Sequence, residues 1–304
     1  MKKDFIALND FSSSELEDML NLAGRIKKSP EDYLSVLKGK TLAMIFNKKS
    51  TRTRISFEVG IFQLGGMALF LGPGDMQLAR GETIADTGKV LSRFADGIML
   101  RTFSHGDILE LARQSTVPVI NGLTDFNHPC QALADMMTVR EKFGKLAGLK
   151  LAYVGDSNNV TVSLLSACVK LGLHITLVSP KGYTITKEAL DMVREEADSK
   201  NLNIVLTEDV AEGVAGAHVI YTDVWTSMGQ EEERQKRLKD LAGYTVDEAV
   251  MKAAGPQAVF MHCLPAHRGE EVSASVIDGP ASIVFDQAEN RLHLQKAVMV
   301  TLMQ

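Results

Sequence analysis

Short apolar runs and segments with helical periodicity alternate along the first half of the chain. Ser12 and Glu15 have the spacing of a capping box, which predicts a helix that ends near Pro30. Beyond it, strands are predicted at Thr41 to Phe46, Met67 to Leu71, Gly97 to Arg101 and Val117 to Ile120. Helices are predicted at Thr51 to Leu64, Thr83 to Phe94, Asp107 to Gln114 and Pro129 to Phe143. Such alternation predicts a mainly parallel sheet.

The alternation starts afresh after residues 144–150, which indicates a second domain. Its predicted strands are Leu151 to Gly155, His174 to Val178, Asn203 to Leu206, Val219 to Thr222 and Ala258 to Met261. A helix rich in Glu, Lys and Arg follows residue 229, and its charges are interpreted as a solvated face. The last predicted helix is Asp286 to Leu302.

The pattern therefore predicts an α/β fold of two doubly wound domains with mainly parallel sheets and an active site in the interdomain cleft. We expect one domain to comprise residues 1–143 plus 286–304 and the other residues 144–285. A chain of 304 residues is long enough for two such domains.

Composition narrows the class of protein. The net charge is −5 and no basic run is interleaved with aromatic residues, which argues against a nucleic-acid surface. The apolar runs are shorter than the ~18 residues of a membrane span, so no membrane association is expected. Three cysteines, Cys130, Cys168 and Cys263, without close Cys/His clusters indicate neither a disulfide framework nor a metal site. We expect a cytoplasmic protein.

Ser50-Thr51-Arg52-Thr53-Arg54 is the first candidate site, because it stands where a strand is followed by a helix. A helix N-terminus offers free N–H groups and the positive end of the helix dipole, hydroxyls add donors, and arginine grips two oxygens. These features indicate a phosphate site. The alternative is an ordinary cap followed by solvated arginines.

Two further segments add donors at other turns of the first domain. Arg101 ends a predicted strand, and the carboxyl ends of parallel strands are where such sheets bind ligands. His128-Pro129-Cys130-Gln131 opens a predicted helix with proline as its first residue. On this segment alone, a helix cap with a buried histidine is the favoured interpretation.

Together these donors suit a compact anion with a phosphate, a carbonyl oxygen and an amide nitrogen. The hydroxyls and Arg52 would bind the phosphate, Thr53, Arg101 and His128 the carbonyl oxygen, and Gln131 the nitrogen. In the second half, Asn159, Asp223 and Ser227-Met228 offer an amide, a carboxylate and loop N–H groups. That set suits an amino acid, with Asp223 binding an ammonium group.

Five motifs, STRTR, HPCQ, GDSNN, DVWTSMG and HCLPAHRG, occur in this order over most of the chain. In this set the chain resembles the ornithine carbamoyltransferases. STRTR and HPCQ are shared by the wider superfamily that transfers a carbamoyl group from carbamoyl phosphate, whereas DVWTSMG and HCLPAHRG narrow the acceptor to ornithine.

The resemblance implies which residues bind the substrates, with no cofactor and no metal. The implied carbamoyl phosphate site consists of Ser50, Thr51, Arg52, Thr53, Gln77, Arg101, His128, Pro129, Cys130, Gln131, Cys263, Leu264 and Arg291. The implied L-ornithine site consists of Asn159, Asp223, Ser227 and Met228. The implied catalytic residues are Arg52, Arg101, His128, Asp223 and Cys263.

The resemblance also implies a role for each domain and an assembly. The first domain would bind carbamoyl phosphate and the second ornithine, in a homotrimer whose Gln77 loop reaches the neighbouring subunit. The product would be citrulline, for arginine biosynthesis. Arg54 is expected in a structural ion pair, and His262, His267 and Arg268 are expected to be loop scaffolding.

Proton transfer gives Cys263 a possible role of its own. Deprotonating an amine with a pKa near 10.4 at pH 7 costs about 4 to 5 kcal/mol. A closed, dry site near arginines would lower that cost, and Cys263 beside Asp223 would bind or relay the proton. Cys130 and Cys168 are interpreted as small buried apolar residues.

Other functions remain open at this point. Putrescine, N-acetylornithine and aspartate are less suitable acceptors. Putrescine lacks the carboxylate that Asn159 would bind, and N-acetylornithine lacks the ammonium group that Asp223 would bind. Aspartate would need cations where this chain has an acid. A binding or regulatory protein without catalysis is another possibility. So is a nucleotide-binding domain around Gly155, although the usual glycine fingerprint is missing.

Overall fold

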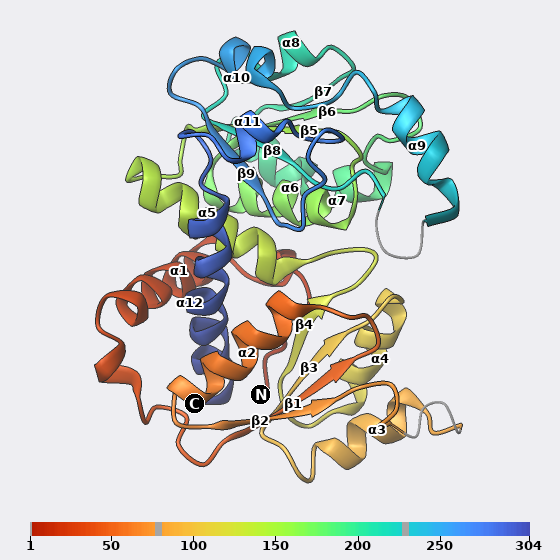
Figure 1. The fold of residues 1–304 in the computed structure, drawn as a ribbon. Helices are drawn as coiled ribbons and strands as arrows, with labels where there is room; N and C mark the ends of the chain where they lie inside the picture. Colours follow the sequence, from red (N-terminus) through yellow and green to blue (C-terminus); the bar gives the residue numbers. More distant parts are fainter. Residues whose placement is uncertain (1, 77–80, 227–230) are drawn as a thin grey trace. The chain divides into compact units, whose positions relative to one another are not determined.

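The computed structural model describes residues 2–76, 81–226 and 231–304, and the chain forms two compact units (Figure 1). The first unit runs to Met137 and includes Glu289–Gln304, and the second is Thr138–Ala288. Both changes of unit fall inside helices, within α5 (Pro129–Phe143) and α12 (Val284–Met303). The two helices therefore each contribute to both units.

The first unit contains a four-stranded parallel sheet. Its strand order is β2-β1-β3-β4, with β1 (Thr41–Phe46), β2 (Met67–Leu71), β3 (Gly97–Arg101) and β4 (Val119–Leu123). The other helices of this unit are η1 (Leu8–Asp10), α1 (Ser13–Lys28), η2 (Pro30–Tyr33), α2 (Thr51–Gln63), α3 (Ile84–Leu91) and α4 (His105–Gln114). The capping box at Ser12 is confirmed, because its side chain accepts a hydrogen bond from the Glu15 N–H.

The fourth strand extends beyond its prediction. It was expected at Val117 to Ile120 but continues to Leu123, through an Asn–Gly pair that usually marks a turn. The buried Asn121 side chain instead donates to the Ile6 carbonyl at 3.0 Å, and a Cβ at Gly122 would lie 2.5 Å from Met99 Sδ. Tertiary contacts therefore override the local turn preference.

The second unit contains a five-stranded parallel sheet. Its strand order is β7-β6-β5-β8-β9, with β5 (Lys150–Val154), β6 (His174–Val178), β7 (Ile204–Thr207), β8 (Val219–Thr222) and β9 (Val259–His262). Its other helices are α6 (Asn159–Leu171), α7 (Lys187–Ser199), α8 (Val210–Val214), η4 (Glu231–Glu233), α9 (Arg234–Asp240), α10 (Glu248–Ala254) and α11 (Ala274–Ile277). The predicted α/β class with parallel sheets in two domains is confirmed.

In each sheet, the strand that comes first in the sequence lies inside the sheet, and later strands are added on both of its sides. β1 lies between β2 and β3, and β5 lies between β6 and β8. Where the strand order reverses, the loops that follow two adjacent strands separate to opposite faces and leave a space at the carboxyl ends. The fold therefore creates one such position beside β1 and β3 and another beside β5 and β8.

The short helix α8 packs closely on the second sheet and gives a test of the packing. A Cβ added at Gly213 would lie 2.4 Å from Val178 Cγ2 and 3.0 Å from Thr207 Cγ2. We predict that Gly213→Ala lowers the free energy of unfolding by about 1 to 3 kcal/mol, because the core has no room for the methyl group. Denaturant unfolding followed by circular dichroism measures the change.

Gly24 in α1 is the matched control for this substitution. No atom lies within 4 Å of a Cβ added there, so Gly24→Ala should be neutral or stabilising by about 0.5 to 1 kcal/mol. Equal stability of the two variants would show that α8 does not pack as described.

Candidate functional site

The Ser50 to Arg54 segment forms the N-terminus of α2, directly after β1. Ser50 is the N-cap, and its hydroxyl accepts a hydrogen bond from the Thr53 N–H at 3.2 Å. Thr53 is buried, Arg52 is half-buried and Thr51 is exposed. The predicted strand-to-helix junction is confirmed, so the hydroxyls and the first N–H groups of α2 lie together at the carboxyl end of β1.

Arg54 points to a different environment from Arg52. Its Nε donates to Glu58 Oε1 at 3.1 Å, and its guanidinium lies 3.7 Å from the centre of the Phe70 ring. The expected structural ion pair is confirmed. The two arginines of the motif thus provide a natural comparison, since Arg54 is held by the carboxylate of Glu58 one helical turn away.

Arg101 links the ends of β3 and β1. The residue is buried at the end of β3, and its Nε donates to the Lys48 carbonyl at 3.2 Å, two residues before Ser50. Lys48 is itself buried, and its Nζ lies 3.1 Å from Asp125 Oδ1. Lys48 was not among the predicted site residues, although a lysine next to a phosphate-type motif was a usable signal.

His128 and Gln131 flank the start of α5, whose first residue is Pro129. Burial lowers the pKa of His128 well below its usual value, and the charges of Arg291, Arg101, Arg52 and Lys48 lower it further. The imidazole is therefore neutral near pH 7. Basic side chains from α2, β3, α12 and the segment after β1 therefore all act on one histidine.

The thiol of Cys130 is buried in the same unit. Its Sγ donates to the Asn121 carbonyl at 3.4 Å, and burial raises the pKa of the thiol to about 12. A neutral thiol turned into the core offers nothing to an anion, so this residue can contribute to a ligand site only through its backbone N–H near the start of α5.

Arg291 of α12 joins the two helix N-termini. Its guanidinium donates to Gln131 Oε1 at 2.5 Å and to Thr53 Oγ1 at 3.1 Å. Gln131 in turn donates to Asp135 Oδ1 at 2.8 Å. All four side chains are buried, so this network holds the starts of α2 and α5 in one arrangement.

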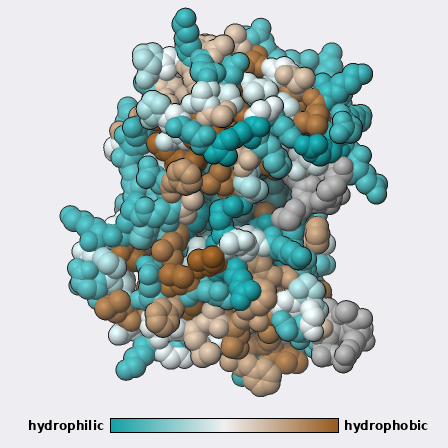
Figure 2. Space-filling model, viewed as in Figure 1, coloured by the Kyte–Doolittle hydropathy of each residue, from teal (hydrophilic) through white to brown (hydrophobic). Residues whose placement is uncertain are grey.

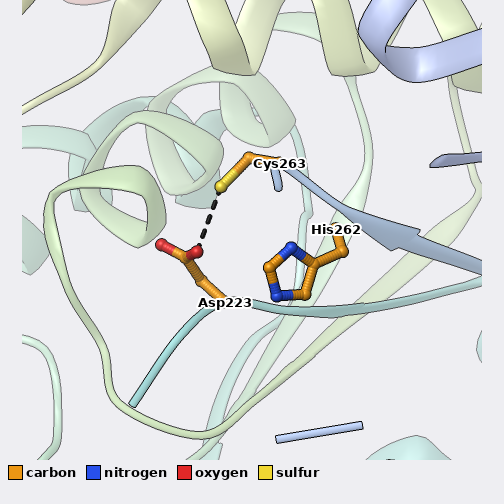
Figure 3. A group of neighbouring side chains, drawn as sticks. All are labelled: Asp223, His262 and Cys263. Atoms are coloured by element: carbon orange, nitrogen blue, oxygen red, sulfur yellow. Dashed lines mark hydrogen bonds between the residues drawn. The ribbon is translucent and has the colours of Figure 1, made fainter. Parts of the chain in front are cut away.

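In the second unit, Asp223 and Cys263 lie side by side after the neighbouring strands β8 and β9. The Cys263 thiol donates to Asp223 Oδ1 at 3.1 Å, as drawn in Figure 3. The Val224 N–H donates to the same oxygen at 2.8 Å. The expectation that Cys263 stands beside Asp223 is confirmed by this hydrogen bond.

Asn158 bonds to Asp223, although the sequence analysis named its neighbour Asn159 and not Asn158. Its Nδ2 donates to Asp223 Oδ2 at 2.7 Å, and its Oδ1 accepts from the Val160 N–H at 2.9 Å as the N-cap of α6. Asn159 is the first residue of that helix. The preference of asparagine for the N-cap position could have identified Asn158.

His262, the last residue of β9, stabilises the loop that follows this strand. His262 is fully buried, and its Nδ1 accepts from the Leu264 N–H at 2.8 Å while its Nε2 lies 3.3 Å from Glu271 Oε1. Arg268 pairs with Asp278 at 2.6 Å. Leu264 has a φ of +59°, and the Leu264–Pro265 peptide is cis. These contacts fit the expected scaffolding role of His262 and Arg268.

Two groups of side chains have metal-ligand chemistry, but their atoms already serve the protein. The ligand atoms of Asp223, His262 and Cys263 lie within 4.8 Å of one another (Figure 3), as do those of His267, Glu270 and Glu271. In the first group Cys263 donates to Asp223 and His262 accepts from Leu264. In the second, Glu271 accepts from the His267 N–H. We therefore assign no metal to either group.

Three of the expected site residues, Gln77, Ser227 and Met228, lie outside the residues that the structure describes. Within the described residues, no helix is both long enough and apolar enough to cross a membrane.

Comparison with known proteins covers nearly the whole chain. Residues 3–141 match the family model "Aspartate/ornithine carbamoyltransferase, carbamoyl-P binding domain", and residues 147–302 match "Aspartate/ornithine carbamoyltransferase, Asp/Orn binding domain". A protein of Oceanobacillus iheyensis named ornithine carbamoyltransferase is 55% identical over 303 residues, covering 99% of this chain and 94% of the relative. One of Bacillus subtilis with the same name is 53% identical, with 99% and 94% covered.

A solved structure agrees with these relatives. The ornithine carbamoyltransferase from Pyrococcus furiosus has a TM-score of 0.95 and 50% identity, with 99% of this chain and 97% of that chain covered.

The lowered pKa of His128 predicts how stability changes with pH. An unfolded histidine takes up a proton below about pH 6.5, whereas folded His128 does not, so the free energy of unfolding should fall as the pH drops below that value. The contribution is at most about 1.4 kcal/mol per pH unit. Denaturant unfolding between about pH 7 and pH 5, compared between the native protein and His128→Gln, measures it. Identical pH dependence in the two proteins would contradict the neutral, buried imidazole.

Proposed function

The chain belongs to the aspartate/ornithine carbamoyltransferase family, and we propose that it transfers the carbamoyl group of carbamoyl phosphate to the δ-amine of L-ornithine, giving L-citrulline and phosphate. The observation that carries this proposal is the identity of 50 to 55% to proteins named ornithine carbamoyltransferase over almost the entire chain. The side chains gathered at the strand ends of each unit supply the chemistry.

Carbamoyl phosphate is proposed to bind at the carboxyl ends of β1 and β3, in the domain of residues 1–143 plus 286–304. Ser50, Thr51, Arg52 and the N-terminus of α2 bind the phosphate, and Thr53, Arg101 and His128 bind the carbonyl oxygen. Gln131 and Arg291 of the same domain are proposed to complete this part of the site. Its support is the cluster of Arg52, Arg101, Arg291 and Lys48 whose charges act on His128. Such a concentration of cations favours a phosphate ligand.

L-Ornithine is proposed to bind in the domain of residues 144–285, on Asn159, Asp223, Ser227 and Met228. Asp223 is buried at the end of β8 and accepts three hydrogen bonds, from Asn158, Val224 and Cys263. These bonds fix the carboxylate so that it can bind an ammonium group with little reorganisation. Putrescine and N-acetylornithine remain the alternative acceptors. Identification of the ureido product formed from each amine distinguishes them.

The chemical step is direct attack by the neutral δ-amine on the carbamoyl carbon. The new C–N bond gives a tetrahedral intermediate whose oxyanion accepts hydrogen bonds from Thr53, Arg101 and His128, and the C–O bond to phosphate then breaks. His128 is neutral because its pKa is lowered, and a neutral imidazole can still donate one N–H to this oxygen. Asp223 and Cys263 take up or pass on the amine proton, and the departing phosphate is the final acceptor.

The proposed active form is a cytoplasmic homotrimer that serves arginine biosynthesis, with Gln77 reaching the neighbouring subunit. A hydrophobic surface on the first unit supports the assembly. Ile55, Val59 and Phe62 are exposed on one face of α2, and Met67 and Leu69 are exposed on the edge strand β2, where Figure 2 shows hydrophobic side chains gathered. An exposed apolar face of this kind marks an interface with another protein surface.

Arg52 and Arg54 give the sharpest test of the phosphate site. We predict that Arg52→Gln lowers kcat by about 100- to 1000-fold, because a donor to the leaving phosphate is lost from the transition state. Arg54→Gln should keep most activity, since Arg54 is held by Glu58 and Phe70. Steady-state assays of citrulline formation compare the two. Equal activity of both variants would refute the role of Arg52.

The trimer is tested at Phe62, which is 76% exposed. Phe62→Glu places a charge in the apolar face of α2 and should dissociate the assembly, which sedimentation equilibrium measures. Leu109→Glu on α4 is the control, because Leu109 is also exposed but lies on another helix. A native protein that sediments as a monomer would rule the trimer out.

A further inference from the structure

Arg237 departs from the expected character of its helix. The charges of α9 were predicted to form a solvated face, and Arg234 and Lys236 do so, with side chains 45% and 72% exposed. The prediction is wrong for Arg237, because its side chain is only 10% exposed. A buried guanidinium requires partners, and those partners identify what this residue does.

The guanidinium of Arg237 connects two loops that are far apart in sequence. Its NH1 donates to Asp156 Oδ2 at 2.6 Å and to the Trp225 carbonyl at 3.1 Å. Its Nε donates to Glu233 Oε2 at 3.0 Å, one turn earlier on the same part of the chain. The first two contacts are with the segments that follow β5 and β8, the strands between which the order of the sheet reverses.

Each of these two loops contains one residue of the Asn158–Asp223 pair, and Asp223 belongs to the proposed ornithine site. Asp156 precedes Asn158 by two positions, and Trp225 follows Asp223 by two positions. Asn158 and Asp223 are themselves joined by the 2.7 Å hydrogen bond between their side chains. The two loops are thus connected by two sets of contacts, the bond from Asn158 to Asp223 and the bonds from Arg237 to Asp156 and Trp225.

The surroundings of Arg237 leave these loops little freedom. Trp225 is buried and packs with Tyr183 and Leu241. A Cβ at Gly155, which has a φ of +126°, would lie 3.3 Å from Trp225 Nε1. The Tyr153 hydroxyl donates to the Asp156 carbonyl at 2.7 Å. Both loops are therefore packed in place, and the Arg237 guanidinium bonds to each of them.

We propose that Arg237 is a positioning residue for the amino-acid substrate, which holds the Asp156–Asn158 turn and the Asp223–Trp225 segment at the separation that binds the ammonium group. This inference rests on the proposed function of Asp223. Lysine cannot replace Arg237 in this role, because a single ammonium does not reproduce a planar fork that bonds to Glu233 through Nε and to the Asp156 carboxylate and the Trp225 carbonyl through NH1.

The test compares Arg237→Lys and Arg237→Gln with the native enzyme. Arg237→Lys keeps the charge beside Asp156 but not the fork, and it should raise the KM for ornithine by about 10- to 100-fold, as expected for a small displacement of site residues. The KM for carbamoyl phosphate should change less than about twofold, because Arg237 belongs to the other substrate's unit. Thermal unfolding, measured in parallel, should stay within a few degrees of the native value for this variant.

Arg234→Gln is the matched control. Arg234 lies on the same helix, but it is exposed and pairs with Glu270 and not with Asp156. Its KM values should equal those of the native enzyme. Asp156→Asn should raise the KM for ornithine like Arg237→Gln, and the double variant should add little to either, because both substitutions break the same connection.

Three results separate the possible failures. An unchanged ornithine KM in Arg237→Lys and Arg237→Gln would overturn the inference. A rise in both KM values together with a fall in thermal stability would also overturn it, since that pattern indicates general destabilisation. Asp223→Asn tests the underlying site. If it leaves the ornithine KM unchanged, the proposed function of Asp223 fails, whereas a large effect there and none at Arg237 overturns only the present inference.

Discussion

The structure depends on one constraint of parallel sheets, the reversal of strand order beside β1 and beside β5. At such a reversal, two adjacent strands send their following loops to opposite faces, and the carboxyl ends between them stay open. In the first unit this places Ser50 after β1 and Arg101 at the end of β3. In the second it places Asn158 after β5 and Asp223 after β8. The same topological rule therefore places both groups of candidate site residues at strand ends.

Residue type then gives the two positions opposite chemistry. Arginines and a lysine from several elements act on His128 in the first unit, and burial together with these charges keeps that imidazole neutral. Arg291 bonds to Gln131 and Thr53, so the two helix starts cannot move independently. Such buried networks fix the donors before a ligand arrives, which is the condition for electrostatic stabilisation of a transition state.

Much of this was predictable from sequence, and the failures have a common cause. Strand positions, the capped start of α2 and the neighbouring Asp223 and Cys263 follow from local patterns, or from a family resemblance that rests on them. The end of β4, the burial of Arg237 and the bond from Asn158 to Asp223 do not, because each depends on a contact between distant segments. The Arg237–Asp156 pair spans 81 positions, a distance over which periodicity carries no information.

The two carboxylates at the end of the second sheet show how environment divides similar groups. Asp156 is paired with the guanidinium of Arg237, so its formal charge is cancelled, and burial raises its pKa against that pairing. The donors described on Asp223 are an amide, a backbone N–H and a thiol, all neutral groups. Hydrogen bonds from neutral groups orient a carboxylate but leave its net charge in place. Asp223 is therefore the one of these two acids whose described partners are all neutral, which fits the proposed binding of an ammonium group, while Asp156 is paired with Arg237.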